Sequence, residues 1–184
     1  MSATASAQAQ GSGNVSRCWT SAGNTLARWS RWTARNVHWW LAAIAVLAWL
    51  QTHFVLGINA TQSLPGKVYL VERGVQPAKG EVVAFHWTGG GGYAAGHTFL
   101  KRIVGVAGDR IDVQGRDVLV NGALIATAKV VSQKGEPLAM IAPGEIPTGY
   151  VFVRGDHVNS LDSRYALCGL IPVERVLGRG HELF

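Results

Sequence analysis

Residues 98–109 read TFLKRIVGVAGD, and the first nine of them predict a β-strand. Successive side chains of a strand point to opposite faces, so Phe99, Lys101 and Ile103 would share one face. A lysine between two large apolar groups loses its hydration when that face is covered. Desolvation disfavours the ammonium and lowers its pKa, which is what a general base requires. An edge lysine that borders solvent is the alternative.

Further strands are predicted on both sides of this segment. They are residues 67–73, 81–87, 117–126, 150–154 and 173–179. Residues 117–126 predict a hairpin, because Asn121-Gly122 supplies the positive φ angles of a type I′ turn. The glycine run 89–92 predicts a mobile loop between strands. Strands at this spacing predict an all-β domain over residues 59–184.

An apolar stretch, residues 39–58, precedes the predicted strands and reads WWLAAIAVLAWLQTHFVLGI. Twenty helical residues rise about 30 Å, which matches one hydrocarbon core and predicts a transmembrane anchor. A cleavable signal peptide is the alternative, but the long preceding segment and the lack of a clear small-x-small site favour a retained anchor. All nearby arginines precede the stretch, so the N-terminus would be cytoplasmic and the C-terminal domain external.

The charge of the chain is unevenly distributed. The 184 residues carry a net charge of +6, and residues 1–38 contribute four arginines and no acid. This segment predicts a disordered, basic cytoplasmic tail. Its tryptophans Trp19, Trp29 and Trp32 alternate with arginines and would suit base stacking. Basic residues before an apolar span are ordinary topology signals, however, so no nucleic-acid partner is expected.

The two cysteines, Cys18 and Cys168, would lie on opposite sides of the predicted membrane span. They therefore predict no disulfide within one chain. Cys168 is expected to be a small buried residue rather than a reactive thiol.

Ser63 follows the turn-prone residues 59–62 and precedes Leu64-Pro65. Pro65 favours extended geometry at Leu64, which would fix the backbone after the serine. The Thr61 hydroxyl and the Ser63 N–H would form a two-donor oxyanion site if this segment is extended. Taken alone, the segment is also compatible with an ordinary loop serine.

A third polar segment, residues 155–164, reads GDHVNSLDSR and follows a predicted strand. Asp162 and Arg164 are two residues apart and would form a local ion pair. Ser160 would be able to bind a lysine amine and orient it. As an isolated run, the segment is also typical of a solvated loop.

Together the three segments resemble the type I signal peptidase family, the leader peptidases that use a Ser/Lys dyad. Family members have a Ser-x-Pro box after a membrane anchor, then Lys-Arg-(Ile/Val)-(Val/Ile)-Gly-x-x-Gly-Asp, then Gly-Asp-x-x-x-x-Ser-x-Asp-Ser-Arg. Here these boxes are residues 63–65, 101–109 and 155–164, and residues 77–85 resemble the strand between the first two. The Asn-x-Thr before Ser63 is most similar to the TraF-type peptidases of conjugative transfer. His157 departs from the asparagine usual in the third box.

The resemblance implies a signal-peptidase-like antiparallel, partly open β-barrel domain with one N-terminal transmembrane helix. A small accessory insert is expected at about residues 112–145. Ser63 would be the nucleophile and Lys101 its general base, with Ser63 N–H and Thr61 in the oxyanion hole. The remaining expected site residues are Ser160, which would orient the lysine, and the supporting charged residues Asp162, Arg164 and Arg102.

The function implied is that of a serine endopeptidase in the bacterial inner membrane, with a periplasmic catalytic domain. Its partners would be the lipid bilayer and an exported precursor, namely a conjugative pilin or transfer protein. Cyclisation of the product and contacts with conjugation or type IV secretion components stay open. No cofactor is implied, and the six histidines show no metal-ligand spacing.

Several alternatives stay open at this point. The chain would also suit a housekeeping signal peptidase I or a non-catalytic component of a secretion or conjugation channel. A Ser-His-Asp triad would draw on His86, His97 or His157, but no Gly-x-Ser-x-Gly elbow surrounds Ser63. Self-cleaving Ser/Lys repressors are disfavoured by the predicted anchor.

Overall fold

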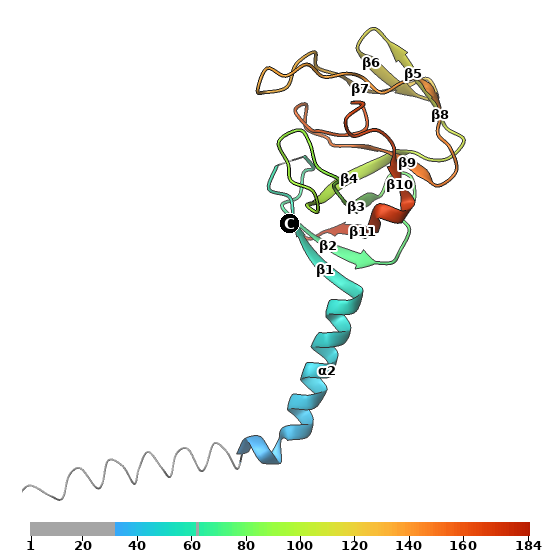
Figure 1. Ribbon diagram of the computed structural model, residues 1–184. Helices are drawn as coiled ribbons and strands as arrows, with labels where there is room; N and C mark the ends of the chain where they lie inside the picture. Colours follow the sequence, from blue (N-terminus) through green and yellow to red (C-terminus); the bar gives the residue numbers. More distant parts are fainter. Residues whose placement is uncertain (1–31, 62) are drawn as a thin grey trace, which may run out of the picture. The chain divides into compact units, whose positions relative to one another are not determined.

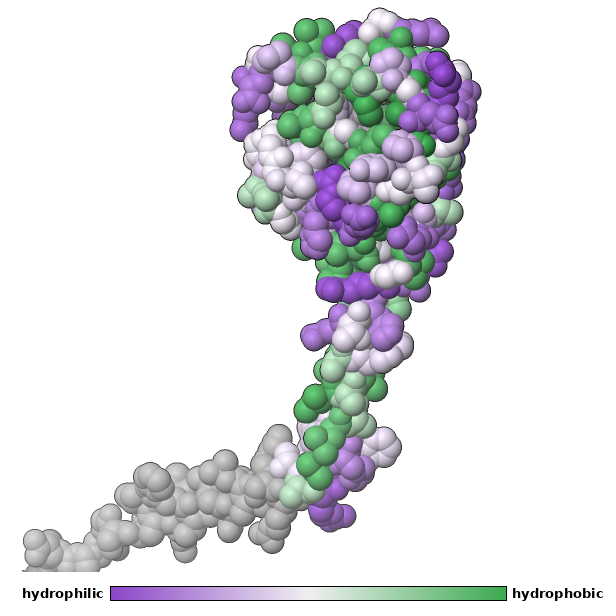
Figure 2. All heavy atoms as spheres, turned by 45° about the vertical axis from the view of Figure 1, so that its right-hand side comes forward, coloured by the Kyte–Doolittle hydropathy of each residue, from purple (hydrophilic) through white to green (hydrophobic). Residues whose placement is uncertain are grey.

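The computed structural model describes residues 32–61 and 63–184. The predicted tail, residues 1–38, and Cys18 therefore fall largely outside the described residues. The chain divides into two units, a first that ends at Trp49 and a second from Leu50 to Phe184. Helix α2 (Val37–His53) exposes large apolar side chains along its length, and Figure 2 shows its surface as largely hydrophobic.

In the described ranges 32–61 and 63–184, no helix has both the length and the apolar character that crossing a bilayer requires.

The predicted helix over residues 39–58 is wrong in its last five residues. Helix α2 ends at His53, and Phe54–Ile58 form strand β1, which pairs antiparallel with β2 (Val68–Arg73). Aromatic and β-branched residues favour strands, and Gly57 disfavours a helix interior. The apolar run continues across this boundary, so hydropathy alone did not reveal it.

The larger sheet has seven strands, and every neighbouring pair is antiparallel. Its order is β1, β2, β11 (Val176–Glu182), β3 (Val82–His86), β4 (Thr98–Gly105), β9 (Tyr150–Arg154) and β10 (Ile171–Pro172) (Figure 1). The strands predicted at 67–73, 81–87, 98–106 and 150–154 are confirmed. The strand predicted at 173–179 is only partly right, because Val173–Arg175 form a 3₁₀ turn before β11 begins.

The sheet curls so that its edge strand β1 reaches β4. A Cβ added to Gly57 would lie 3.1 Å from Leu100 Cδ1, although β2, β11 and β3 separate the two strands in the sheet. Among the described strands no pairing joins the edges β1 and β10, so the sheet is curled but not closed. The mainly antiparallel β fold is therefore confirmed. The curl also places the residues after β1 beside the middle of β4.

A second sheet contains β7 (Ala123–Thr127), β6 (Asp117–Val120), β5 (Arg110–Gln114) and β8 (Gly144–Glu145), in that order. The predicted hairpin is confirmed, since Asn121 and Gly122 have φ angles of 51° and 79°. Ile111 and Ile146 pack with Phe152 of β9, which joins the two sheets. This sheet overlaps residues 112–145, whose role as an accessory insert stays a prediction.

Candidate active site

Lys101 lies in the middle of the larger sheet rather than at an edge, because β4 has β3 on one side and β9 on the other. Its side chain is only 4% exposed, and its Nζ donates a hydrogen bond of 2.8 Å to Ser160 Oγ. Nζ also lies 5.5 Å from the centre of the Phe99 ring. The alternative of a solvated edge lysine is therefore wrong.

Burial lowers the pKa of the Lys101 ammonium from 10.5 to about 8, while the nearby charge of Asp162 acts in the opposite direction. At pH 7 about a tenth of the molecules would carry a neutral amine at this position. An unperturbed lysine would be neutral in fewer than about one molecule in a thousand. Burial thus raises the fraction of neutral Lys101 amine near neutral pH.

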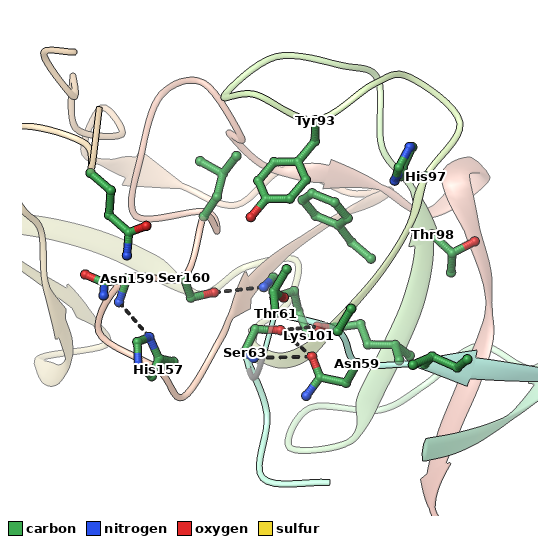
Figure 3. Close-up of a pocket in the computed structure, with 16 residues that line it drawn as sticks. Asn59, Thr61, Ser63, Tyr93, His97, Thr98, Lys101, His157, Asn159 and Ser160 are labelled. Carbon is green, nitrogen blue, oxygen red and sulfur yellow. Dashed lines mark hydrogen bonds between the residues drawn. The ribbon is translucent and has the colours of Figure 1, made fainter. Parts of the chain in front are cut away.

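Ser63 lies in the loop after β1 and is 3% exposed. It lines the same pocket as Lys101, a cavity of about 550 Å³ (Figure 3). The Ser63 hydroxyl is directed to Asn59 Oδ1 at 3.2 Å and to the Leu100 carbonyl at 3.4 Å. Among the described contacts its oxygen is not hydrogen-bonded to Lys101 Nζ.

Asn59 was not predicted as a site residue, although it contacts Ser63 directly. It is buried, and its Nδ2 donates to the carbonyls of Leu64 and Gly66, both at 2.8 Å. These two bonds fix the carboxamide so that Oδ1 accepts from both the N–H and the Oγ of Ser63, each at 3.2 Å. The predicted oxyanion donor, Ser63 N–H, is thus occupied by Asn59 in this state.

Thr61 is exposed and lines the pocket with Ser63. The predicted contribution of its hydroxyl to an oxyanion hole stays a prediction.

The segment that carries Ser160 also contains a buried ion pair, Asp162–Arg164. The Arg164 guanidinium binds the Asp162 carboxylate in bidentate fashion, with Nε–Oδ1 and Nη2–Oδ2 both at 2.7 Å. Asp162 Oδ2 also accepts from the N–H of Gly155 at 2.8 Å, and Arg164 Nη2 donates to the Gly155 carbonyl at 3.3 Å. The pair therefore fixes the backbone of Gly155, which lies next to Ser160 Oγ.

Gly155 begins the third box, but the sequence assigned it no role in the site. A Cβ added there would lie 2.0 Å from Ser160 Oγ, 2.6 Å from Ser160 Cβ and 3.1 Å from the Ser63 carbonyl oxygen. No side chain fits between these groups, so glycine is needed for Ser160 to approach Lys101. The next residue, Asp156, donates its N–H to that Ser63 carbonyl at 2.6 Å.

Arg102, which was predicted to support the site together with Asp162 and Arg164, is not bonded to that buried pair among the described contacts. It lies on the opposite face of β4 from Lys101, donates to the Gly80 carbonyl at 2.8 Å and is 3.8 Å from Asp156. It thus contacts the 155–164 segment at Asp156 and not at the Asp162–Arg164 pair.

The three histidines of the alternative triad differ in their positions relative to the pocket. His97 and His157 line the pocket, whereas His86 lies on the exposed end of β3. His157 Nδ1 accepts from the N–H of Asn159 at 3.1 Å. Within the described residues, neither pocket histidine is hydrogen-bonded to the Ser63 hydroxyl.

Replacing Asn59 with alanine is expected to lower the free energy of unfolding by about 1–3 kcal/mol, because two buried carbonyls and the Ser63 N–H lose their partner. Urea denaturation would measure the change. Asn159→Ala is the matched control, since this asparagine lines the same pocket but is exposed, and a shift within about 0.5 kcal/mol is expected. An equal loss in both variants would contradict a structural role for Asn59.

Comparisons with known proteins give the family of the chain. The family described as "Signal peptidase, peptidase S26" matches residues 29–184. A probable signal peptidase I-2 of Synechocystis sp. is 34% identical over 110 residues, which cover 59% of this chain and 48% of that protein. A probable conjugal transfer protein TraF of Sinorhizobium fredii is 34% identical over 86 residues, covering 46% of this chain and 44% of that protein.

Among solved structures, a signal peptidase I from Enterococcus faecalis superposes with a TM-score of 0.37 at 21% identity. That match covers 56% of this chain and 96% of the other, and it is too distant to support an inference. The chain matches about half the length of the curated relatives named above. From the extent of the family match, the chain belongs to the signal peptidase, peptidase S26 family.

Proposed function

We propose that this protein is a membrane-anchored serine endopeptidase that cleaves exported precursors with a Ser63/Lys101 dyad. The observation that carries the proposal is a buried lysine, its pKa lowered to about 8, in the pocket that Ser63 also lines. A charged lysine in the core is costly, and among the described residues its amine contacts only a hydroxyl by hydrogen bond. Such a group is typical of a catalytic base.

The proposed reaction is an acyl transfer to serine followed by hydrolysis. Neutral Lys101 takes the proton as Ser63 Oγ attacks the scissile carbonyl carbon. The Ser63 N–H gives up its hydrogen bond to Asn59 Oδ1 and donates to the developing oxyanion instead. The Thr61 hydroxyl donates the second hydrogen bond to this oxyanion. The Lys101 ammonium then protonates the leaving amine. In the second half, Lys101 activates a water that hydrolyses the acyl-enzyme and restores the Ser63 hydroxyl.

Anchoring in the inner membrane, with the N-terminus cytoplasmic and the domain periplasmic, belongs to the same proposal. Apolar side chains exposed along α2, among them Leu41, Ile44 and Leu47, support it. So do Leu56 and Ile58, which are 66% and 76% exposed on β1 beside the pocket. An apolar rim next to the site suits a peptidase that works at a bilayer surface.

The substrate we propose is a precursor with small side chains near the cut, and specifically a conjugative pilin or transfer protein. The TraF relative and the Asn-x-Thr-x-Ser-x-Pro motif at residues 59–65 support this choice. General secretory preproteins are the second candidate. The probable signal peptidase I-2 of Synechocystis sp. is 34% identical to this chain, as is the TraF relative.

The test is to express the full chain with candidate pilin and secretory precursors and to find by mass spectrometry which one is shortened, and where. Cleavage at one defined bond of a pilin precursor supports the proposal. A lactam-type probe that acylates serines separates an enzyme from a channel component. If no precursor is shortened and Ser63 remains unlabelled, the chain is a non-catalytic component.

The rate of cleavage is expected to depend on pH through Lys101. The base is active only when neutral, so kcat/KM should rise about tenfold per pH unit below pH 8 and level off above it. A pH profile between 5.5 and about 9.5 on one peptide would check this. A rate that is highest at pH 6 and falls toward pH 8 would indicate a different base.

A further inference from the structure

A second groove of about 480 Å³ adjoins the active-site pocket. Its walls are the glycines 91–92, the segment 129–139 and the apolar side chains of Leu161, Tyr165 and Leu167. The two cavities share five lining residues, which are Tyr93, Gln133, Asn159, Ser160 and Leu161. The groove is thus a continuation of the pocket and opens from it beside Ser160.

The position of Lys101 indicates which part of a substrate would enter this groove. In the proposed reaction Lys101 gives its proton to the leaving amine, so that amine must approach Lys101 Nζ. Nζ is bound to Ser160 Oγ, which forms the wall between the cavities. The chain on the amine side therefore leaves past Ser160. The acyl side extends toward Ile58 and Thr98, which line only the first pocket.

The glycines of the 89–92 run keep the groove open. A Cβ added to Gly91 would lie 2.7 Å from Leu161 Cδ2, and one added to Gly92 would lie 2.9 Å from Lys134 Nζ. Both glycines also have positive φ angles, of 61° and 86°, that other residues rarely adopt. This run is therefore a wall of the groove as well as a connection between strands.

The charged side chains along the groove are Lys129, Lys134 and Glu136. Lys129 Nζ donates to Asn159 Oδ1, and the Lys134 amine lies over Gly92. In the described part of the chain, neither lysine forms an ion pair with a carboxylate. The groove thus offers two cations and one anion beside apolar walls.

We propose that this groove binds the substrate residues that follow the scissile bond and prefers an acidic side chain opposite Lys134. The inference rests on the proposed peptidase function and adds a specificity site on the leaving-group side. An extended chain fits because its alternate side chains would meet the apolar wall and the lysines in turn.

The experiment uses the full chain in detergent and a peptide mixture with small residues before the cut and randomised residues after it. Mass spectrometry of the products gives relative kcat/KM at each position. Wild type is expected to prefer Asp or Glu over Lys by about twofold to fivefold at one position after the cut. Lys134→Gln should remove this preference, and Lys134→Glu should reverse it.

Lys67→Glu is the matched control, because Lys67 is exposed and lines neither cavity. It should keep the wild-type preference. Cleavage with no charge preference after the cut, or a preference that Lys134→Glu leaves unchanged, overturns the inference alone. If wild type cleaves no peptide and no precursor, the proposed function fails and the inference fails with it.

Discussion

Ser63→Ala is expected to reduce precursor cleavage by about 10³-fold or more, because the change removes the hydroxyl that is proposed to form the acyl-enzyme. The measurement is kcat/KM on a peptide that the wild type cleaves, followed by mass spectrometry. The variant should also lose labelling by a serine-acylating lactam. Its fold should be retained, since the backbone contacts of residue 63 with Asn59 and Asp156 do not need the hydroxyl.

The result that would contradict this expectation is cleavage at the wild-type site by the folded Ser63→Ala protein. Labelling of a different serine by the lactam would point to another nucleophile. Either outcome would leave the buried lysine without its proposed partner.

Lys101→Met and Lys101→Arg are each expected to abolish cleavage to a similar extent. The methionine side chain has no basic group, and the arginine guanidinium keeps its proton at every accessible pH. The arginine variant is the more informative one, since it preserves the charge. A role for Lys101 as a fixed positive charge predicts activity in Lys101→Arg, whereas a role as a base predicts none.

The stability of Lys101→Met distinguishes loss of chemistry from loss of folding. The folded-state pKa of Lys101 is lowered, so the folded protein binds fewer protons than the unfolded chain between about pH 8 and pH 10.5. The free energy of unfolding of the wild type therefore rises with pH across this window. Below the window, the buried ammonium lowers the free energy of unfolding. At pH 7 the methionine variant should unfold at the wild-type temperature or above.

Lys67→Met is the control for this pair, because its side chain is exposed and away from the pocket. It should retain wild-type activity and stability. A cleavage defect in Lys67→Met as large as in Lys101→Met would show that the assay responds to charge on the domain rather than to the base.

The strands of the fold were predictable wherever the pattern was local. The 98–106 strand and the Asn121-Gly122 hairpin each depend on residues next to one another. Strand β1 was missed because its apolar residues continue the hydropathy of α2, and only pairing with β2 distinguishes them. Strand β8 has two residues and carries no signal of its own.

The residues of the candidate site also differ in how far the sequence indicated their roles. Ser63, Lys101 and Ser160 stand in short motifs that can be recognised along the chain. Asn59 and Gly155 also stand in motifs, but the motifs assigned them no role, because their contacts join segments that meet only in the folded protein.

Arg102 shows what a motif position leaves open about a side chain, and its supporting role stays a prediction. It was grouped with the residues around Lys101 by its position in a motif. Neighbours on a strand point to opposite faces, so strand alternation already separated the two side chains.

The position of β11 in the larger sheet has a consequence for when activity can appear. β2 and β3 are not paired with each other, and β11 alone joins them. Until this strand inserts, the hairpin that leads to Ser63 and the strands that carry Lys101 are separate pieces of the sheet. We therefore expect Ser63 and Lys101 to come together only after β11 has paired with both of its neighbours, so that the proposed peptidase activity would appear late in folding.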